Sequence, residues 1–125
     1  MLLAIDTSAG TSTAIFDGEK LLAFVEYDDP FGHAENIGNA IAEVLAKAKL
    51  SAGEVSSVAI GRGPAPYTGL RVGMAAGTSF AAALQLPMYS VMNLDAVALS
   101  LGDAKIVVSS DAKRRELFVA AYESG

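Results

Sequence analysis

The segment from Gly61 to Arg71, with the sequence GRGPAPYTGLR, constrains the fold of this chain more than any other. It lies between the apolar run Ser57–Gly61 and a long alanine-rich stretch, and its glycines and prolines interrupt regular structure. A buried strand, a turn and a helix in this order form the repeating unit of mixed α/β sheets. We therefore expect a strand to end at Gly61 and a helix to run from about Thr68 to Leu86.

Hydrophobic periodicity predicts the other elements. Apolar or alternating runs indicate strands over Leu2–Asp6, Thr11–Phe16, Leu21–Tyr27, Met88–Val91, Ile106–Asp111 and Glu116–Tyr122, and helical spacing indicates helices over His33–Leu50 and Leu94–Leu101. The expected architecture over residues 1–103 is one α/β lobe with a mixed central sheet flanked by helices. The last strand pair, over residues 104–125, echoes the opening of the chain. It is predicted to begin a second, truncated lobe.

Composition limits the classes of function. The chain has nine Lys and Arg against fourteen Asp and Glu, so its net charge of −5 repels a phosphate backbone. Because there are no cysteines, disulfides, thiolate metal sites and cysteine nucleophiles are excluded. The uncharged stretch between Arg71 and Asp95 is long enough to cross a bilayer, but Pro87 divides it into two elements. With no basic leader at the amino terminus, we expect a cytoplasmic protein that does not span a membrane.

Small residues recur along the second predicted helix at intervals of four, as Gly69, Gly73, Gly77 and Ala81. Glycine inside a helix costs roughly 0.5–1 kcal/mol relative to alanine, so the spacing indicates a face that packs closely against another backbone. We expect that backbone to be internal. A second protein is the alternative.

The strand-to-helix junction also suggests an anion site. Backbone N–H groups at a helix start can face an anion, which makes Gly61, Arg62 and Gly63 candidate nucleotide- or anion-binding residues. Arg71 would add a cation within the first turn. The alternative is a rigid connection that binds nothing.

The same segment resembles a pattern of the TsaB (YeaZ) family, whose members share Gly-x-Gly-Pro-Gly-x-Phe-Thr-Gly-Leu-Arg-x-Gly with their paralogue TsaD. The matching residues are Gly61, Gly63, Pro64, Thr68, Gly69, Leu70, Arg71 and Gly73. The chain departs at Ala65, where glycine is usual, and at Tyr67, where phenylalanine is usual. Leu3–Ser8 and Asp111–Arg114 also resemble the family, so the similarity runs over the whole chain.

This resemblance implies a lobe of the actin-like/sugar-kinase/Hsp70 ATPase (ribonuclease H-like) fold. In that fold a nucleotide lies between two lobes, and the turn matched here by Asp6, Thr7, Ser8 and Thr11 approaches its phosphates. Asp6 would orient a hydrated magnesium ion, and Asp111 would begin the second such turn. Alternatively, the hydroxyls satisfy backbone groups of the turn. We expect no resident cofactor, with weak ATP and Mg²⁺ binding at a shared interface as the alternative.

The single histidine, His33, bears on metal binding. In TsaD this region carries a His-x-x-x-His pair that binds a catalytic metal, but the second position here is Ile37. Because one histidine supplies too few ligands, we expect no metal site. His33 is predicted to be a helix cap or a surface residue.

The resemblance therefore implies a non-catalytic accessory or scaffold subunit in the synthesis of tRNA N6-threonylcarbamoyladenosine (t6A). Such a subunit would bind TsaD through its helices, or form a homodimer in its absence, in a complex that includes a TsaE-like ATPase. No direct tRNA binding and no membrane contact are expected. The candidate partner interface comprises Ile37, Ile41, Val44, Leu45, Leu70, Arg71, Met74 and Thr78, unless this stripe belongs to the core. The alternative functions are an ATP-binding phosphotransferase or ATPase of the same fold, and a glycoprotease-like hydrolase.

Overall fold

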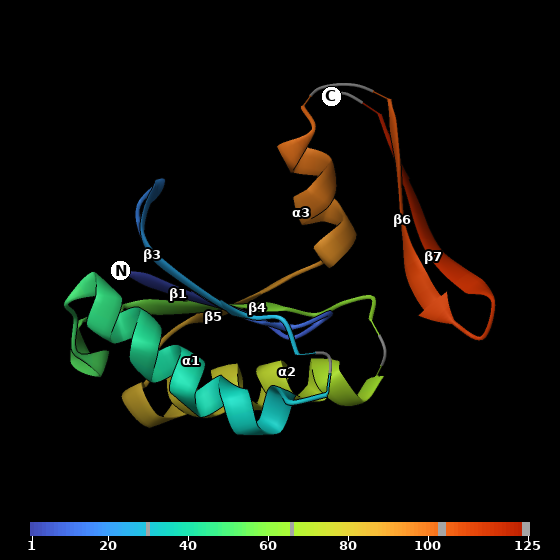
Figure 1. Cartoon of the computed structure of the whole chain (residues 1–125). Coiled ribbons are helices and arrows are strands. Elements are labelled where there is room, and N and C mark those ends of the chain that lie inside the picture. Colours follow the sequence, from blue (N-terminus) through green and yellow to red (C-terminus); the bar gives the residue numbers. More distant parts are fainter. Residues whose placement is uncertain (30, 66, 103–104, 124–125) are drawn as a thin grey trace.

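A computed structural model of the chain describes residues 1–29, 31–65, 67–102 and 105–123. Its elements, shown in Figure 1, are β1 (Leu2–Asp6), β2 (Thr11–Asp17), β3 (Lys20–Tyr27), α1 (His33–Ala48), the 3₁₀ turn η1 (Ala52–Glu54), β4 (Ser57–Gly61), α2 (Tyr67–Leu84), β5 (Met88–Val91), α3 (Asn93–Ser100), β6 (Ile106–Lys113) and β7 (Glu116–Tyr122). Each predicted strand and helix is confirmed in type, and its ends differ from the prediction by at most two residues.

Five strands form one mixed sheet in the order β3-β2-β1-β4-β5. β1 is antiparallel to β2 but parallel to β4, and β4 is parallel to β5. The carboxyl ends of β1, β4 and β5 therefore meet at one edge of the sheet. The segments that follow these strands are brought together there, although they are distant in the sequence.

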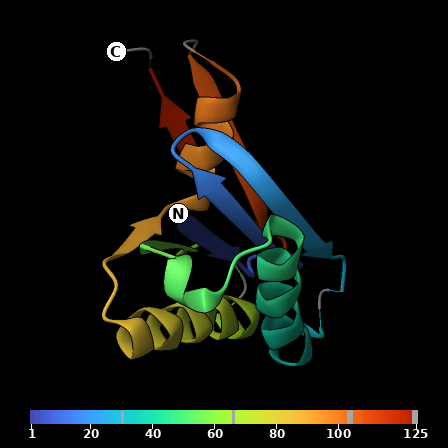
Figure 2. The ribbon, with the colours of Figure 1, turned by 90° about the vertical axis from the view of Figure 1, so that its left-hand side faces the viewer.

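Helices α1 and α2 lie together on one face of this sheet (Figure 2). Leu3 and Ile5 of β1 and Val58 and Ile60 of β4 alternate toward that face and are nearly inaccessible to solvent. The opposite face is apolar but open, and it carries Phe24, Tyr89 and Val91, which are 48%, 58% and 41% exposed. The core of the chain thus lies between the sheet and a single layer of helices.

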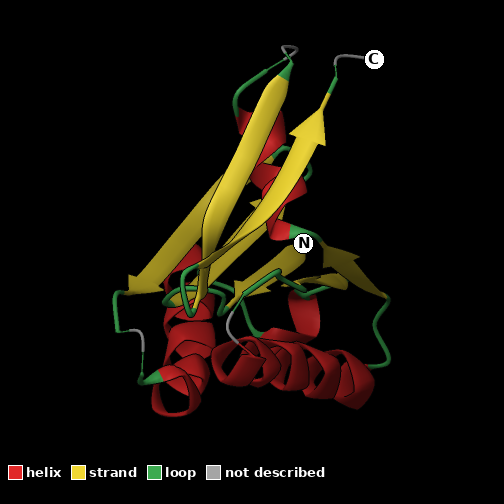
Figure 3. Cartoon of the chain, turned by 90° about the vertical axis from the view of Figure 1, so that its right-hand side faces the viewer, coloured by secondary structure: helices red, strands yellow, loops and turns green. Residues whose placement is uncertain are grey.

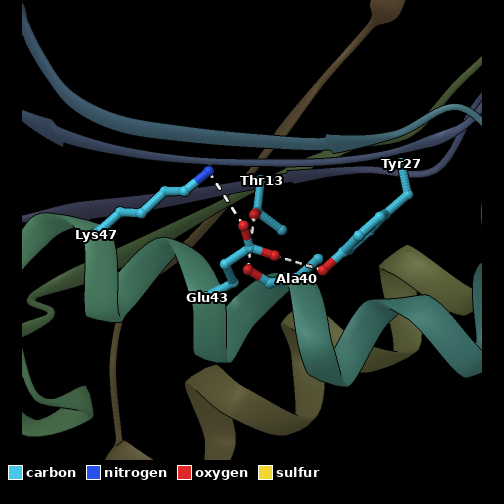
Figure 4. Close-up of polar contacts among 5 residues, drawn as sticks. All are labelled: Thr13, Tyr27, Ala40, Glu43 and Lys47. Atoms are coloured by element: carbon cyan, nitrogen blue, oxygen red, sulfur yellow. Dashed lines mark hydrogen bonds and ion pairs between the residues drawn. The ribbon is translucent and has the colours of Figure 1, made fainter.

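Polar contacts fix α1 over β2 and β3 (Figure 4). The Thr13 hydroxyl donates to the Ala40 carbonyl at 3.0 Å, and the Tyr27 hydroxyl donates to the Glu43 carboxylate at 2.5 Å. Glu43 also pairs with Lys47 at 3.1 Å. The hydrogen bond from Tyr27, followed by that from Lys47, holds the pKa of Glu43 below its ordinary value, and the same Tyr27 bond raises the tyrosine pKa.

The small-residue face of α2 packs internally, as predicted. A Cβ atom added at Gly73 would collide with the Thr7 side chain, and one added at Gly77 would collide with Ile60. Ala81, one step further along the stripe, is 4% exposed within the core. These positions allow α2 to approach β1 and β4 closely.

β6 and β7 form a separate antiparallel hairpin. Its inner face packs on α3, where Leu94, Ala98 and Val108 form a second, smaller core. Thus α3 packs against the hairpin and not on the five-stranded sheet, although the sequence placed it in the first lobe. The predicted lobe boundary at residues 103 and 104 falls outside the described residues.

No helix within the described ranges is long and apolar enough to cross a membrane. The alanine-rich stretch that includes α2 ends at Leu84, and Gln85 follows with a φ of 54°.

Candidate functional site

A polar network lies where the carboxyl ends of β1, β4 and β5 meet. The Asp6 carboxylate accepts hydrogen bonds from the Ser8 N–H at 3.0 Å and from the Ser8 hydroxyl at 2.5 Å. The side-chain amide of Asn93, the first residue of α3, donates to the other Asp6 oxygen at 2.6 Å and to the Ser8 hydroxyl at 2.9 Å. One amide therefore connects the end of β1 to the start of α3. Both carboxylate oxygens of Asp6 have partners within the chain.

The same asparagine holds the glycine-rich loop after β4. The Asn93 side-chain oxygen accepts the N–H of Gly63 at 2.8 Å, and the Asn93 N–H donates to the Gly63 carbonyl at 2.8 Å. Gly63 has a φ of +88°, a conformation that side chains rarely adopt. Gly61 has no room for a Cβ because the Asp6 carboxylate lies against it. Gly61 and Gly63 thus allow the loop backbone to approach the side chains of Asp6 and Asn93 closely.

The structure shows internal acceptors for two backbone donors of the anion cradle that was predicted at Gly61, Arg62 and Gly63. The Arg62 N–H donates to the Val91 carbonyl at 2.9 Å, and the Gly63 N–H donates to Asn93. Donors that already have internal acceptors would have to break those bonds to bind a phosphate. In the structure these two N–H groups hold the loop to β5 and α3, and anion binding by Gly61, Arg62 and Gly63 stays a prediction. Pro66 in the same loop lies outside the described residues.

Two of the predicted phosphate-binding hydroxyls are buried. Thr7 is 1% exposed, and its hydroxyl donates to the Gly69 carbonyl at 2.6 Å while accepting the Gly73 N–H at 2.9 Å. Thr11 is completely buried beside His33. The burial of both hydroxyls argues against a direct contact with a ligand in the cleft. Thr7 instead joins the turn after β1 to the backbone of α2.

His33 is also corrected: it is neither a surface residue nor the cap of α1. It is 8% exposed, its Nδ1 lies 3.4 Å from the Thr11 hydroxyl, and Gly32 is the N-cap. The imidazole fits against α2 because Gly69 has no side chain. Its role in the described structure is to fill the space between β2, α1 and α2.

The donor set does not fit a resident metal ion. Within the residues that the structure describes, no group of three or more His, Asp and Glu residues is placed to hold one. Asp6, which the resemblance assigned to a hydrated magnesium ion, is already held by Ser8 and Asn93. No chemical step through a metal ion follows from this arrangement.

A cleft of about 1130 Å³ lies between the open face of the five-stranded sheet and the hairpin. Asp6, Ser8 and Asn93 line one wall, and Asp111 and Lys113 of β6 line the other. Most of the remaining lining is apolar, from side chains such as Phe24, Val91 and Val97. The structure thus brings Asp6 and Asp111 to the same cleft, as the resemblance implied.

The hairpin wall is held to α3 by a further polar contact. The Tyr122 hydroxyl donates to the Asp95 carboxylate at 2.5 Å, and this bond raises the pKa of Tyr122 to about 12. Ser110 of β6 has a buried hydroxyl with no partner in the described part of the chain. The contact between Tyr122 and Asp95 joins β7 to the first turn of α3.

The candidate interface residues separate into two groups. Ile37, Val44 and Leu45 lie in the core, at 9%, 0% and 9% exposure, because that side of α1 faces the sheet. Their prediction as partner contacts is corrected. The others lie nearer the surface: Ile41, Leu70 and Met74 are half-buried, and Arg71 and Thr78 are exposed.

Sequence reasoning missed Asn93, which forms hydrogen bonds with Asp6, Ser8 and Gly63 at the strand ends. Its signal was its position: it follows β5 after a single residue, Met92, and begins α3. In a sheet with parallel strands, that position lies at the same edge as the ends of β1 and β4. A polar residue there could have been predicted to meet Asp6.

A family model, curated sequences and solved structures all show similarity between this chain and one protein family. The family model for TsaD, tRNA N6-adenosine threonylcarbamoyltransferase, matches residues 31–125. An uncharacterized protein of Mycobacterium leprae is 37% identical over 100% of this chain and 36% of its own length. The tRNA threonylcarbamoyladenosine biosynthesis protein TsaB of Haemophilus influenzae is 34% identical over 94% of this chain and 51% of its own length.

The structure of YeaZ from Pseudomonas aeruginosa superimposes with a TM-score of 0.87 at 27% identity, over 99% of this chain and 60% of that protein. The chain therefore spans about one third to three fifths of the length of these relatives. Agreement at this level over nearly the whole chain confirms the predicted fold class, an α/β lobe of the actin-like ATPase type.

Proposed function

The chain belongs to the TsaB (YeaZ) branch of the tRNA N6-adenosine threonylcarbamoyltransferase family, and from this premise we propose that it is a non-catalytic accessory subunit in t6A synthesis. In this role it binds a TsaD-like catalytic subunit and supports its fold. The observation that carries the proposal is that the polar groups at the strand ends form hydrogen bonds with one another, within the chain. Asp6, Ser8, Asn93 and the Gly63 N–H bond to one another and form a junction at the carboxyl ends of β1, β4 and β5.

The junction supports this role by fixing α2. Thr7 bonds to two backbone groups of α2, and the small residues Gly73 and Gly77 seat that helix on β1 and β4. A rigid helix offers a preorganised surface, which reduces the entropy lost when a partner binds. The loop motif thus contributes to a binding surface through its effect on α2.

The exposed side of the helical layer is the surface that we assign to the catalytic partner. On α1, the exposed residues Ala34, Gly38, Ala42 and Ala46 recur every four positions, and a Cβ added at Gly38 would meet nothing. Small side chains leave the helix flat, so that a helix of another protein can approach it closely. Half-buried and exposed residues of α2 extend the same layer (Figure 2), and they include Leu70, Arg71, Met74 and Thr78.

The other partners follow from this assignment. In the absence of the catalytic subunit, the same helical layer can pair with a second copy of the chain. A TsaE-like ATPase would join through the complex, and tRNA would be held by other subunits because this chain carries a net charge of −5. Threonylcarbamoyl transfer would take place on the catalytic subunit.

The alternative functions have less support from the geometry. A phosphotransferase or ATPase needs donors for phosphate and ligands for magnesium, and the loop donors and Asp6 are used internally. A metal-dependent glycoprotease needs a second ligand beside His33, where the chain has Ile37, and His33 itself is buried.

The experiment that tests the proposal is the solution mass of the chain mixed with a TsaD-like subunit from the same source, measured by size exclusion with light scattering. We expect a complex containing both polypeptides. Two unshifted species at tens of micromolar protein would contradict the proposal. Calorimetric titration with ATP and Mg²⁺ separates the enzyme alternative, which requires saturable binding by the chain alone.

A further inference from the structure

Helix α3 and the hairpin β6–β7 form one unit with a core of its own. Leu94, Ala98 and Val108 are buried in this core, and Phe118 and Tyr122 pack against it. The larger core of the chain lies between the five-stranded sheet and its two helices, α1 and α2. Figures 1 and 3 show α3 and the hairpin side by side, extending away from those two helices. Two such units move relative to one another unless a large apolar interface or specific bonds hold them.

Open space lies between the hairpin and the rest of the chain. The cleft of about 1130 Å³ borders β6. A second cavity, of about 520 Å³, borders β7 and lies between Phe118 and Ala120 of that strand and Arg62 and Pro64 of the glycine-rich loop. The hairpin therefore has room to rotate, and a rotation would change the width of both spaces.

The two units are joined at Met92 and Asn93, which we call the joint, because β5 ends one residue before Met92 and α3 begins at Asn93. Asn93 binds the first unit through its main chain and both ends of its side-chain amide. Its N–H donates to the Gly63 carbonyl and its side-chain oxygen accepts the Gly63 N–H, both at 2.8 Å. Its side-chain nitrogen donates to Asp6 at 2.6 Å and to the Ser8 hydroxyl at 2.9 Å. Hinge rotations are commonly absorbed by residues at the ends of elements, which is where these bonds lie.

The two ends of the Asn93 amide face groups of opposite character. The oxygen meets a donor, the Gly63 N–H, and the nitrogen meets an acceptor, the Asp6 carboxylate. An amide satisfies both groups at once. A carboxylate at this position would repel Asp6, and a methyl group would leave both groups without a partner. The side chain thus holds α3 in one direction relative to the ends of β1 and β4.

We propose that Asn93 is a positioning residue that sets the angle between the α3–hairpin unit and the five-stranded sheet, and with it the width of the cleft. While its amide is bound to Asp6 and Gly63, the two units keep one orientation. When these bonds are removed, the chain stays folded because each unit keeps its own core, and the α3–hairpin unit rotates at the joint. The inference concerns the joint alone and does not rest on the proposed function.

The test is the distance between two spin labels in the folded 125-residue chain, measured by pulsed electron paramagnetic resonance. Because the chain has no cysteine, Glu19→Cys and Val107→Cys place one label in the turn between β2 and β3 and one on β6. Labelled chain is diluted with unlabelled chain, so that only distances within one chain are measured. We expect a narrow distribution with Asn93 in place and a distribution at least twice as broad for Asn93→Ala.

An exchange of two side chains separates an effect on the angle from a general loss of stability. Asn93→Asp places a carboxylate against Asp6, so like-charge repulsion should broaden the distribution. Addition of Asp6→Asn restores one amide and one carboxylate in exchanged positions, and it should return the narrow distribution. Asn39→Cys in place of Val107→Cys puts both labels on the sheet and its helices, and this control pair should give the same distribution in every variant.

Circular dichroism shows whether each variant folds. A distribution that is equally narrow in Asn93→Ala, Asn93→Asp and the parent would overturn the proposal, as would a parent distribution that is already broad. Equal broadening of the control pair, or a double variant that stays as broad as Asn93→Asp, would assign the change to general loosening and would overturn it too. Failure of Asn93→Ala to fold would also contradict it, since each unit is expected to keep its core.

Discussion

The carboxylate of Asp6 accepts a 2.6 Å hydrogen bond from the side-chain amide of Asn93, which lies 87 residues further along the chain. The same amide group holds the N–H of Gly63 through its oxygen. One side chain thus joins the ends of three parallel strands, β1, β4 and β5. These internal hydrogen bonds hold the conformation of the glycine-rich loop.

Replacement of Asn93 tests this junction. Asn93→Ala removes three side-chain hydrogen bonds and leaves the Gly63 N–H and one Asp6 oxygen without a partner. Because an unsatisfied polar group costs about 1–3 kcal/mol, we expect the free energy of unfolding to fall by that amount. Urea denaturation measures it, with Ser90→Ala, at an exposed position of β5, as the control. Equal stability of the two variants would contradict a structural role for Asn93.

Two glycines in the helices should respond to alanine in opposite directions. A Cβ at Gly73 meets the Thr7 side chain, so Gly73→Ala should destabilise the chain by about 1–3 kcal/mol through overpacking. A Cβ at Gly38 meets nothing, so Gly38→Ala should stabilise by up to about 1 kcal/mol through helix propensity. Thermal and urea unfolding of both variants check this. Addition of Thr7→Ala to Gly73→Ala should cost less than the sum of the single changes, since both act on one contact.

The contact between Tyr122 and Asp95 predicts a stability change in alkali. Tyrosine is neutral when protonated, and the hydrogen bond to Asp95, followed by desolvation, raises the folded-state pKa from its ordinary value of 10.0 to about 12. The stabilisation is therefore complete below pH 10 and is lost as the pH rises through about 12. We expect the unfolding midpoint of Tyr122→Phe to vary less over this range than that of the parent.

Absorbance titration of tyrosine in the folded chain gives an independent readout of this contact. Asp95→Asn removes the carboxylate that raises the pKa of Tyr122, so the late-titrating component near pH 12 should move to lower pH. If the absorbance change near pH 12 remained unchanged in both Tyr122→Phe and Asp95→Asn, a group other than Tyr122 would be responsible for it.

Much of the fold could be predicted from the sequence because its elements have strong local signals. Asp17 and Gly18 mark the turn between β2 and β3, and apolar periodicity defines α1 and α2. The internal packing of Gly73 and Gly77 also followed from their spacing. Periodicity could not show that α3 packs on the hairpin, because that contact depends on the path of the chain between β5 and β6.

The site was harder to predict because hydrogen-bond partners distant in the sequence decide what each group can do. Thr7 and Gly63 carry the residue types of a phosphate site, but the backbone of α2 and the Asn93 side chain occupy their hydrogen-bonding groups. Likewise, the stripe that contains Ile37 and Val44 is amphipathic, and amphipathicity alone does not distinguish a core from a partner interface. Only the tertiary structure separates these cases.

The most direct test of the proposed accessory role is the affinity of the chain for a TsaD-like subunit, measured by calorimetry for Ala42→Arg and for Ala96→Arg. Both changes place arginine at an exposed helical alanine, the first on α1 and the second on α3, away from the helical layer. We predict that Ala42→Arg weakens binding at least tenfold, or about 1.4 kcal/mol, and that Ala96→Arg leaves it unchanged. Equal affinities for the two variants and the parent chain, or no binding by the parent chain, would contradict the account.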